Sequence, residues 1–229
     1  MTVELIAYTQ RPGGSGNPVD VVEQAAAVCY DSKPTRSARI ALACARSGHL
    51  SVWEHINFTF HVSDVSRALL TQLTRHRHAS FSVRSQRYCR EDGFTYINPF
   101  LGQDQPDAQR DFEVIVDFAA QGYEALLRDG AKPEDARMVL PNACCTELYL
   151  TCNGRALIEM SHKRLCSRAQ REIRELFSAM KMTVCEVCPE LARLMRPQCM
   201  QYEVPFCPEH NGCGLYPTLR EVAHGSDQP

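Results

Sequence analysis

The chain has 229 residues, 44% of them hydrophobic, and a formal net charge of −2. This length suits one domain, residues 1–229, with two small domains as the less favoured alternative. No run of about 18 apolar residues and no export signal occurs, so we expect a cytoplasmic protein without a membrane span.

Hydrophobic periodicity and end signals predict a mixture of strands and helices. In chain order we expect a strand at 3–9, helices at 17–29 and 37–47, a strand at 56–62, helices at 64–73, 112–130 and 133–141, a strand at 148–152, and helices at 153–161 and 169–187. Asn17, Ser63 and Asn153 are the expected N-caps of three of these helices. The mixed order predicts an α+β fold with a small, largely antiparallel sheet and several helices.

Basic charge is concentrated in residues 65–90, which hold six arginines, two histidines and no acidic residue. Serines 80, 82 and 85 interrupt any apolar period there, so we expect a loop whose backbone groups are available to a ligand. Planar guanidinium groups among hydroxyls and aromatic rings suit a phosphorylated ligand that contains a ring.

Twelve cysteines are expected to be reduced thiols, because no export signal accompanies them. Those with apolar neighbours are expected to fill the core: Cys29, Cys44, Cys144, Cys145, Cys152 and Cys166. The C-terminal segment 185–213 is rich in cysteine, and Cys199, Cys207, His210 and Cys213 leave a structural zinc site open. Paired Cys-x2-Cys knuckles, which would make the zinc signal strong, are missing from that set.

The basic segment carries Arg75-His76-Arg77, seven further residues, Ser85, one residue, and Arg87-Tyr88. This pattern resembles the signature of the flavin-dependent thymidylate synthases, and the resemblance extends over about residues 26–175. It implies conversion of dUMP to dTMP with methylenetetrahydrofolate as one-carbon donor, FAD as cofactor and NADPH as reductant. It also implies a homotetramer with active sites shared between subunits, and no metal in the site.

The resemblance assigns residues to each ligand. For dUMP they are Gln72, Arg75, Val83, Arg84, Ser85, Gln86, Arg87, Arg137 and Arg164. For FAD they are His49, Ser51, Glu54, Arg75, His76, Arg77, Val83, Asn153, Gly154, Arg155, Glu159 and Arg168. Arg164 matches the arginine thought to favour the N3-ionised uracil, so it is the predicted catalytic residue. Trp53, within the flavin-contacting stretch, is interpreted as a core residue.

Four positions depart from the usual family pattern. Ser82 and Val83 stand where Asn and Glu are common, Glu159 where an amide or aromatic residue is usual, and Arg168 where a histidine often lies. The lost acid at Val83 removes a side-chain contact but leaves backbone contacts possible. These departures concern the flavin and folate contacts, whereas the uridylate-binding arginines are intact.

Other interpretations of the basic segment remain. Ser85 as a covalent nucleophile would need an adjacent base, so a hydrogen bond to phosphate or sugar is the simpler role. The arginines are alternatively solvated or paired with surface acids. Binding of RNA or single-stranded DNA is a different class of function, which the sequence pI near 6.4 disfavours. A flavoprotein of another reaction is a third possibility.

Overall fold

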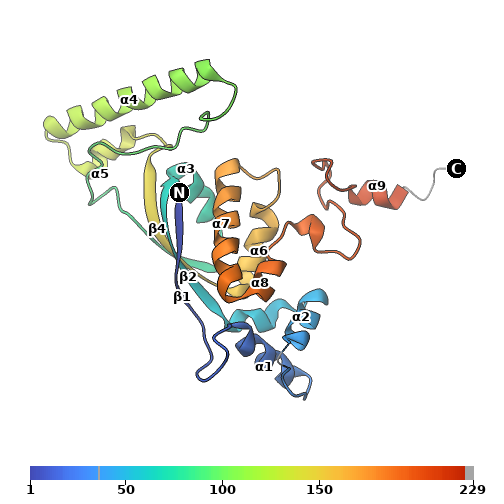
Figure 1. Ribbon diagram of the computed structural model, residues 1–229. Helices are drawn as coiled ribbons and strands as arrows, with labels where there is room; N and C mark the ends of the chain where they lie inside the picture. The colour runs from blue at the N-terminus through green and yellow to red at the C-terminus, as the bar shows by residue number, and fades with distance from the viewer. Residues whose placement is uncertain (36, 225–229) are drawn as a thin grey trace. The chain divides into compact units, whose positions relative to one another are not determined.

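An antiparallel sheet and the helices around it confirm the α+β fold class (Figure 1). The computed structural model describes residues 1–35 and 37–224. Its elements, with η for 3-10 helices, are β1 (Thr2–Tyr8), α1 (Val19–Cys29), α2 (Arg39–Arg46), η1 (Leu50–His55), β2 (Asn57–Ser66), α3 (Arg67–Leu73), β3 (Ala79–Val83), α4 (Pro106–Arg128), α5 (Pro133–Ala136), η2 (Arg137–Val139), β4 (Cys145–Asn153), α6 (Gly154–Arg164), α7 (Arg171–Val187), α8 (Pro189–Leu194), η3 (Gln198–Met200) and α9 (Leu219–His224).

The strands form one sheet in the order β1-β2-β4-β3. Buried residues alternate along the two central strands, including Phe58 and Phe60 in β2 and Leu148 and Leu150 in β4. Because side chains on a strand point alternately to opposite faces, this pattern gives the sheet one core face. The sequence predicted a strand at 56–62 from this period of two, and a strand at 148–152 without it.

The chain divides into two compact units whose segments interleave. Unit 1 comprises residues 1–2, 61–75 and 81–150, and unit 2 comprises residues 3–60, 76–80 and those from 151 onward. Strands β2 and β4 contribute residues to both units. The expectation of a single domain therefore stays a prediction.

Unit 1 has a core built from helices and strand residues. Leu69 and Leu73 of α3 are fully buried, as are Leu148 and Leu150 of β4. Tyr123 of α4 is buried too, and its hydroxyl accepts a 3.1 Å hydrogen bond from the backbone N–H of Glu91. The opposite face of α4 is exposed, which leaves several of its apolar side chains in solvent.

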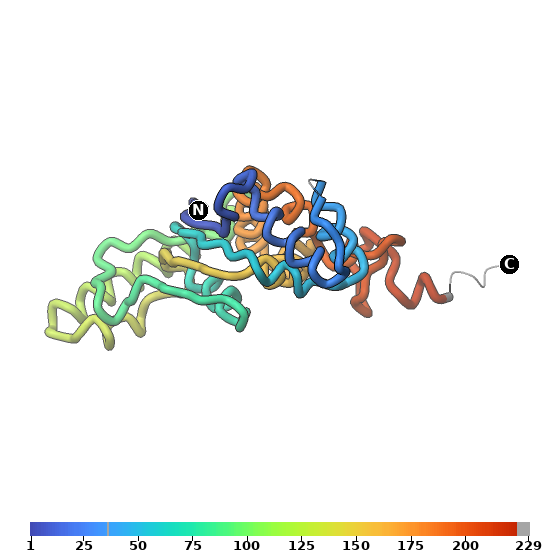
Figure 2. The backbone as a smooth tube through the Cα atoms, turned by 90° about the horizontal axis from the view of Figure 1, so that it is seen from below, coloured from blue at the N-terminus to red at the C-terminus, as the bar shows by residue number. Residues whose placement is uncertain are grey.

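Unit 2 is mainly helical. Helix α7 lies beside α6 and α8 (Figure 1), and its residues Leu176, Phe177 and Met180 are fully buried. Helices α1 and α2, the blue segments in Figure 2, also lie side by side. The carboxylate of Glu23 in α1 accepts hydrogen bonds from the N–H of Ala41 at 2.8 Å and the hydroxyl of Thr35 at 2.6 Å. Burial favours a raised pKa for Glu23, but these hydrogen bonds lower the pKa below its ordinary value.

Three details of the expected elements are wrong. The N-cap of α1 is Pro18 and not Asn17, although the side-chain oxygen of Asn17 accepts from the N–H of Val19 at 2.9 Å.

The other two wrong details concern β2 and β3. Ser63 caps no helix: Asp64 adopts a positive φ of 55°, β2 continues to Ser66, and Ser66 is the residue that caps α3 by accepting from the N–H of Leu69 at 3.0 Å. The stretch expected to be wholly loop contains β3, whose apolar residues alternate with serines. Helices α8 and α9 were not predicted.

All twelve cysteines are free thiols. Cys44, Cys144 and Cys152 are buried as expected, whereas Cys29 is exposed. Burial raises the pKa of Cys152 to about 12, so this thiol is protonated at neutral pH. Within the described ranges, no helix combines the length and the apolar character that crossing a bilayer requires.

Candidate functional site

The predicted uridylate-binding residues other than Arg164 belong to unit 1, where the loop at residues 84–90, here called the arginine loop, follows β3. Backbone hydrogen bonds fix the start of this loop: the N–H of Arg84 donates to the carbonyl oxygen of Glu147 at 3.0 Å. The guanidinium of Arg67 donates to the carbonyl oxygen of Arg84 at 2.8 Å. The loop is thus attached both to β4 and to the first residue of α3.

Glu134 of α5 contacts two of the predicted dUMP-binding residues, Arg87 and Arg137. Its carboxylate accepts a 2.6 Å hydrogen bond from Nε of Arg87, and its backbone carbonyl accepts a 3.1 Å bond from Nε of Arg137. The hydrogen bond and the charge of Arg87 lower the pKa of Glu134. The terminal nitrogens of Arg87 make no hydrogen bond within the described part of the chain, so they are directed by Glu134 and remain available to an anion.

Acidic partners for the arginines come from outside the basic segment. Arg84 forms ion pairs with Glu91 at 3.5 Å and Glu147 at 3.7 Å, and Arg90 pairs with Asp92 at 2.9 Å. The interpretation of these arginines as paired with surface acids therefore holds for part of the cluster. Glu147 and Asp92 are exposed, and pairs with exposed carboxylates contribute little stability in water, so an anionic ligand could compete with them; Glu91 is buried.

Ser85 is placed as a structural hydrogen-bonding residue within the arginine loop. Its hydroxyl oxygen accepts from the backbone N–H of Arg87 at 3.2 Å, and its carbonyl oxygen accepts from the N–H of Cys89 at 2.9 Å. Neither contact is with a general base, which a serine nucleophile would need. The neighbouring Gln86 side chain reaches Sγ of Cys144 at 3.7 Å.

Arg164, the predicted catalytic residue, closes α6 in unit 2 and contacts a histidine of the signature. Its Nε donates a 2.9 Å hydrogen bond to Nε2 of His76. Burial, followed by the charges of Arg164 and Lys163, lowers the pKa of His76 to about 4. His76 is therefore neutral at neutral pH and acts as an acceptor that orients the guanidinium of Arg164.

Several predicted flavin-binding residues meet at the N-terminus of α6. Arg155 donates to Glu159 at 2.7 Å and to Glu54 at 2.8 Å, and these three residues line a cavity of about 230 Å³ with His78, Asn153 and Ala156. Asn153 caps the helix as predicted, since its side-chain oxygen accepts from the N–H of Ala156 at 2.8 Å.

Gly154 occupies a position where the backbone packs too tightly for a side chain. A Cβ atom there would lie 2.8 Å from the carbonyl oxygen of Trp53 and 3.0 Å from Cγ1 of Ile56. Trp53 itself is fully buried, which confirms its interpretation as a core residue. Gly154 thus has a packing role besides any contact with a ligand.

Other predicted flavin residues lie outside this cavity. His49 and Ser51 are exposed at the start of η1, and Arg75 and Arg77 are exposed beyond α3. Arg168 lines a different cavity, described next, where it pairs with Glu209 at 2.8 Å.

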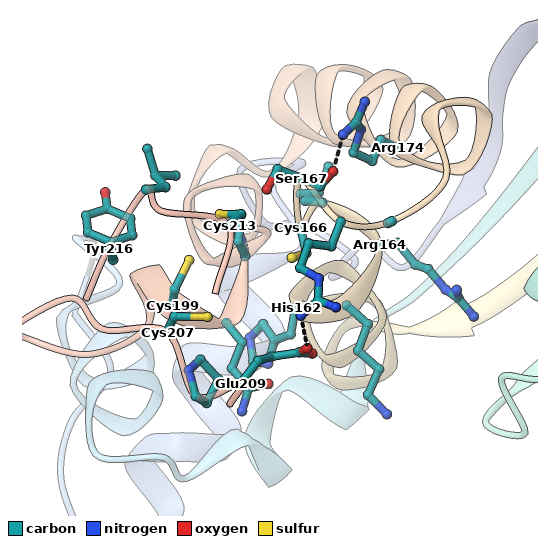
Figure 3. Close-up of a pocket in the computed structure, with 18 residues that line it drawn as sticks. His162, Arg164, Cys166, Ser167, Arg174, Cys199, Cys207, Glu209, Cys213 and Tyr216 are labelled. Atoms are coloured by element: carbon teal, nitrogen blue, oxygen red, sulfur yellow. Dashed lines mark hydrogen bonds and ion pairs between the residues drawn. The ribbon is translucent and has the colours of Figure 1, made fainter. Parts of the chain in front are cut away.

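A second cavity in unit 2, of about 600 Å³, contains four cysteines; we call it the thiol cavity (Figure 3). Cys166, Cys199, Cys207 and Cys213 line it, and three arginines and Lys163 lie around them. His210, part of the open zinc set, is absent from this lining and has its Nδ1 3.1 Å from Oδ1 of Asn211.

Sequence reasoning missed Glu134, Glu147 and His78. Glu134 lies three residues before Arg137, which is a signal that the resemblance did not use. His78 follows the Arg-His-Arg triplet directly and lines the cavity at the N-terminus of α6, here called the flavin-side cavity after the predicted residues that line it. The ion pair between Arg84 and Glu147 joins residues 63 positions apart, so no local sequence pattern predicts it.

A model of the thymidylate synthase complementing protein family matches residues 4–190 of this chain. The chain belongs to this family. All predicted site residues fall within the range matched by the thymidylate synthase complementing protein family, whereas Cys199, Cys207 and Cys213 lie beyond it.

Curated relatives agree with this membership. The flavin-dependent thymidylate synthase of Geobacter sulfurreducens is 38% identical over 217 residues, which cover 90% of this chain and 91% of the relative. That of Clostridium tetani is 34% identical over 247 residues, with 96% of each chain covered. That of Nitratidesulfovibrio vulgaris is 41% identical over 186 residues, which cover 77% of this chain and 75% of the relative.

Proposed function

We propose that this protein is a flavin-dependent thymidylate synthase. It converts dUMP to dTMP, takes the one-carbon unit from methylenetetrahydrofolate, uses NADPH as reductant and releases tetrahydrofolate. The observation that carries the proposal is the family match over residues 4–190, within which this chain keeps the full arginine signature. The names of the relatives, all flavin-dependent thymidylate synthases, support it.

We assign dUMP to the arginine loop and the residues beside it. Arg87 and Arg137 suit the phosphate, because Glu134 holds both and leaves the terminal nitrogens of Arg87 to the ligand. Ser85 and the backbone of the loop supply further hydrogen-bonding groups. The remaining proposed contacts are Gln72, Arg75, Val83, Arg84 and Gln86.

Arg164 is the proposed activating residue. A guanidinium near the pyrimidine stabilises negative charge on the ring, and carbon C5 becomes nucleophilic as that charge develops. His76 holds the guanidinium through Nε, so the direction of the group is set before substrate arrives. Arg164 therefore acts by electrostatic stabilisation and His76 acts by positioning it.

The cavity at the N-terminus of α6 fits part of an FAD molecule. Its lining offers an arginine, a histidine and an asparagine at the N-terminus of an 11-residue helix, where anions are favoured, together with the carboxylates of Glu54 and Glu159, which pair with the arginine. Arg155, Asn153 and His78 would hold the cofactor there. Bound FAD would supply the redox and one-carbon transfer chemistry of the reaction.

We propose a homotetramer with active sites shared between subunits. The flavin-side cavity, about 230 Å³, is smaller than the 300–1,000 Å³ typical of ligand pockets, so FAD needs additional walls. Helix α4 also exposes a patch of Val114 (62% exposed), Ile115 (64%) and Phe118 (77%). Exposed apolar patches of this kind mark protein interfaces. We place the assembled enzyme in the cytoplasm.

The test is tritium release from 5-tritiated dUMP in the presence of methylenetetrahydrofolate and NADPH. Flavin-stripped protein is assayed before and after FAD is added back. We expect release only after FAD is restored, together with formation of dTMP. Absence of release from flavin-loaded, folded protein would show that the enzyme catalyses another reaction.

A further inference from the structure

The thiol cavity gathers cysteines that are distant in sequence. Cys166 comes from the connection between α6 and α7, Cys199 from η3, and Cys207 and Cys213 from the segment before α9. Figure 3 shows the four side chains around one cavity, with their sulfur atoms on its inner side. The proposed reaction uses none of these thiols.

The backbone around Cys207 is held in place. Its N–H donates to the carbonyl oxygen of Pro217 at 2.7 Å, and its own carbonyl accepts from the N–H of Leu219 at 3.1 Å. A Cβ on Gly212 would lie 3.5 Å from Sγ of Cys207, so the chain returns close to this thiol just before Cys213. Two of the thiols are therefore presented by one closed loop.

The lining of the cavity brings the other two thiols, Cys166 and Cys199, into the same cluster (Figure 3). Lys163, Arg164, Arg168 and Arg174 line the cavity against a single carboxylate, that of Glu209. Such positive surroundings favour thiolates and balance the net charge of −2 that a divalent ion with four thiolates carries.

We propose that Cys166, Cys199, Cys207 and Cys213 bind one zinc ion. Four thiolates form a closed tetrahedral set with zinc–sulfur distances of about 2.3 Å, which is typical of structural sites. Among the described residues, no three His, Cys, Asp or Glu side chains already form a metal-binding group. The sulfur atoms already face one cavity (Figure 3), so changes of side-chain rotamer would close them around the ion, as is common where metal binding and local folding are coupled.

This ligand set differs by one member from the set that the sequence left open. His210 is replaced by Cys166, which lies 33 residues before Cys199. The zinc ion would join the connection between α6 and α7 to the C-terminal segment. Three of its four ligands, Cys199, Cys207 and Cys213, lie beyond the residues that the family model matches, and only Cys166 lies within them.

The experiment measures zinc by elemental analysis in the full-length protein, expressed with zinc and dialysed to remove loosely bound ions. We expect about one zinc per chain in the wild type and in His210→Ala. Cys166→Ser and Cys199→Ser should lose most of it, whereas Cys185→Ser, which removes an exposed thiol of α7, should keep it. Circular dichroism establishes that each variant is folded.

Cobalt substitution gives a second readout that does not depend on how a variant folds. Co²⁺ titrated into metal-free wild type should give the intense sulfur-to-cobalt absorption and the visible bands of a tetrahedral four-thiolate site. Wild-type protein that holds no zinc and takes up neither ion would overturn the proposal. So would loss of zinc from His210→Ala with retention in Cys166→Ser.

Discussion

At the scale of single residues, the contact between His76 and Arg164 is the most informative. It joins positions 88 residues apart, through a neutral imidazole that accepts from a guanidinium. Burial accounts for the neutral state first and the neighbouring cations add to it. The pair therefore leads to one prediction for stability, and the proposed role of Arg164 leads to one for catalysis.

Replacement of Arg164 by Ala should abolish turnover while FAD remains bound, because the side chain is proposed to stabilise charge on the pyrimidine and not to hold the flavin. Tritium release and the flavin absorbance of the purified protein measure the two properties separately. Lys163→Ala, at an exposed neighbouring position, is the matched control and should keep its activity. Undiminished dTMP formation by Arg164→Ala would remove Arg164 from the mechanism.

The titration of His76 predicts a loss of stability in mild acid. Its pKa is about 4 in the folded protein against 6.5 for an ordinary histidine, so the unfolded chain binds the proton first as pH falls. His76 therefore lowers the free energy of unfolding, by an amount that grows as the pH falls from 6.5 to about 4 and that is absent above pH 6.5. The urea concentration at the midpoint of unfolding, measured at several pH values, should fall less steeply with decreasing pH for His76→Gln than for wild type.

His55→Gln, at an exposed histidine, serves as the control and should follow the wild-type profile. An equal slope in His76→Gln and wild type would contradict the neutral state of the half-buried imidazole.

At the scale of elements, α5 organises the arginine loop. Glu134 lies in the first turn of a helix that Pro133 opens, and it contacts Arg87 and Arg137 through different oxygen atoms. Because one residue contacts both arginines, the position of α5 would decide where the proposed phosphate site lies.

Glu134→Gln should weaken dUMP binding several-fold, since the charge-assisted bond that directs Arg87 becomes a weaker neutral one. Arg87→Ala should weaken it more, and both should leave FAD affinity nearly unchanged. Asp135→Asn, which removes the adjacent exposed acid, is the control. Titrations of each ligand test this, and unchanged or tighter dUMP binding by Glu134→Gln would show that the carboxylate only competes with the phosphate.

Two glycines in helices predict opposite responses to alanine. Gly154→Ala should lower the free energy of unfolding by roughly 1–3 kcal/mol, because its Cβ would overlap the carbonyl oxygen of Trp53. At Gly122 in α4 an added Cβ would have no atom within 4 Å, so Gly122→Ala should raise the free energy of unfolding by about 0.5–1 kcal/mol, because alanine has the higher helix propensity. Urea denaturation of both variants decides, and a stabilised Gly154→Ala would show that the contact relaxes easily.

Element boundaries show what local sequence can and cannot determine. Asn153 was predicted as a cap because a side-chain oxygen at the N-cap satisfies a backbone N–H within the same turn. Ser63 met the same criterion, but the prediction was wrong: the backbone is left-handed at Asp64, and β2 continues to Ser66. β3 was overlooked although Ala79, Phe81 and Val83 alternate with serines.

At the scale of the whole molecule, signature residues were available from sequence and their partners were not. The resemblance supplied Arg87 and Arg164, but their contacts with Glu134 and His76 join distant segments. The same limit applies to the thiol cavity, where His210 was chosen for its spacing and Cys166 is brought in by the fold. Contacts between residues distant in sequence depend on the tertiary structure, and local patterns in a single sequence do not indicate them.

The proposed tetramer predicts that a charge in the apolar patch of α4 separates the subunits. Phe118→Glu should give a smaller species by light scattering and lose turnover, because an exposed apolar residue would be buried at the interface. Glu124→Gln changes the charge of the same helix by one unit in the opposite direction, outside the patch, and should remain assembled. A tetramer that persists in Phe118→Glu would place the interface elsewhere.

The interleaving of the two units limits how this chain can be recombined. Residues 61–75 and 81–150 belong to unit 1, while the stretches before, between and after them belong to unit 2. Cuts at residues 60 or 150 fall inside β2 and β4, so either would divide a strand. Neither unit can therefore be exchanged with a relative as one contiguous cassette, and functional chimeras require crossover points in the loops outside these strands.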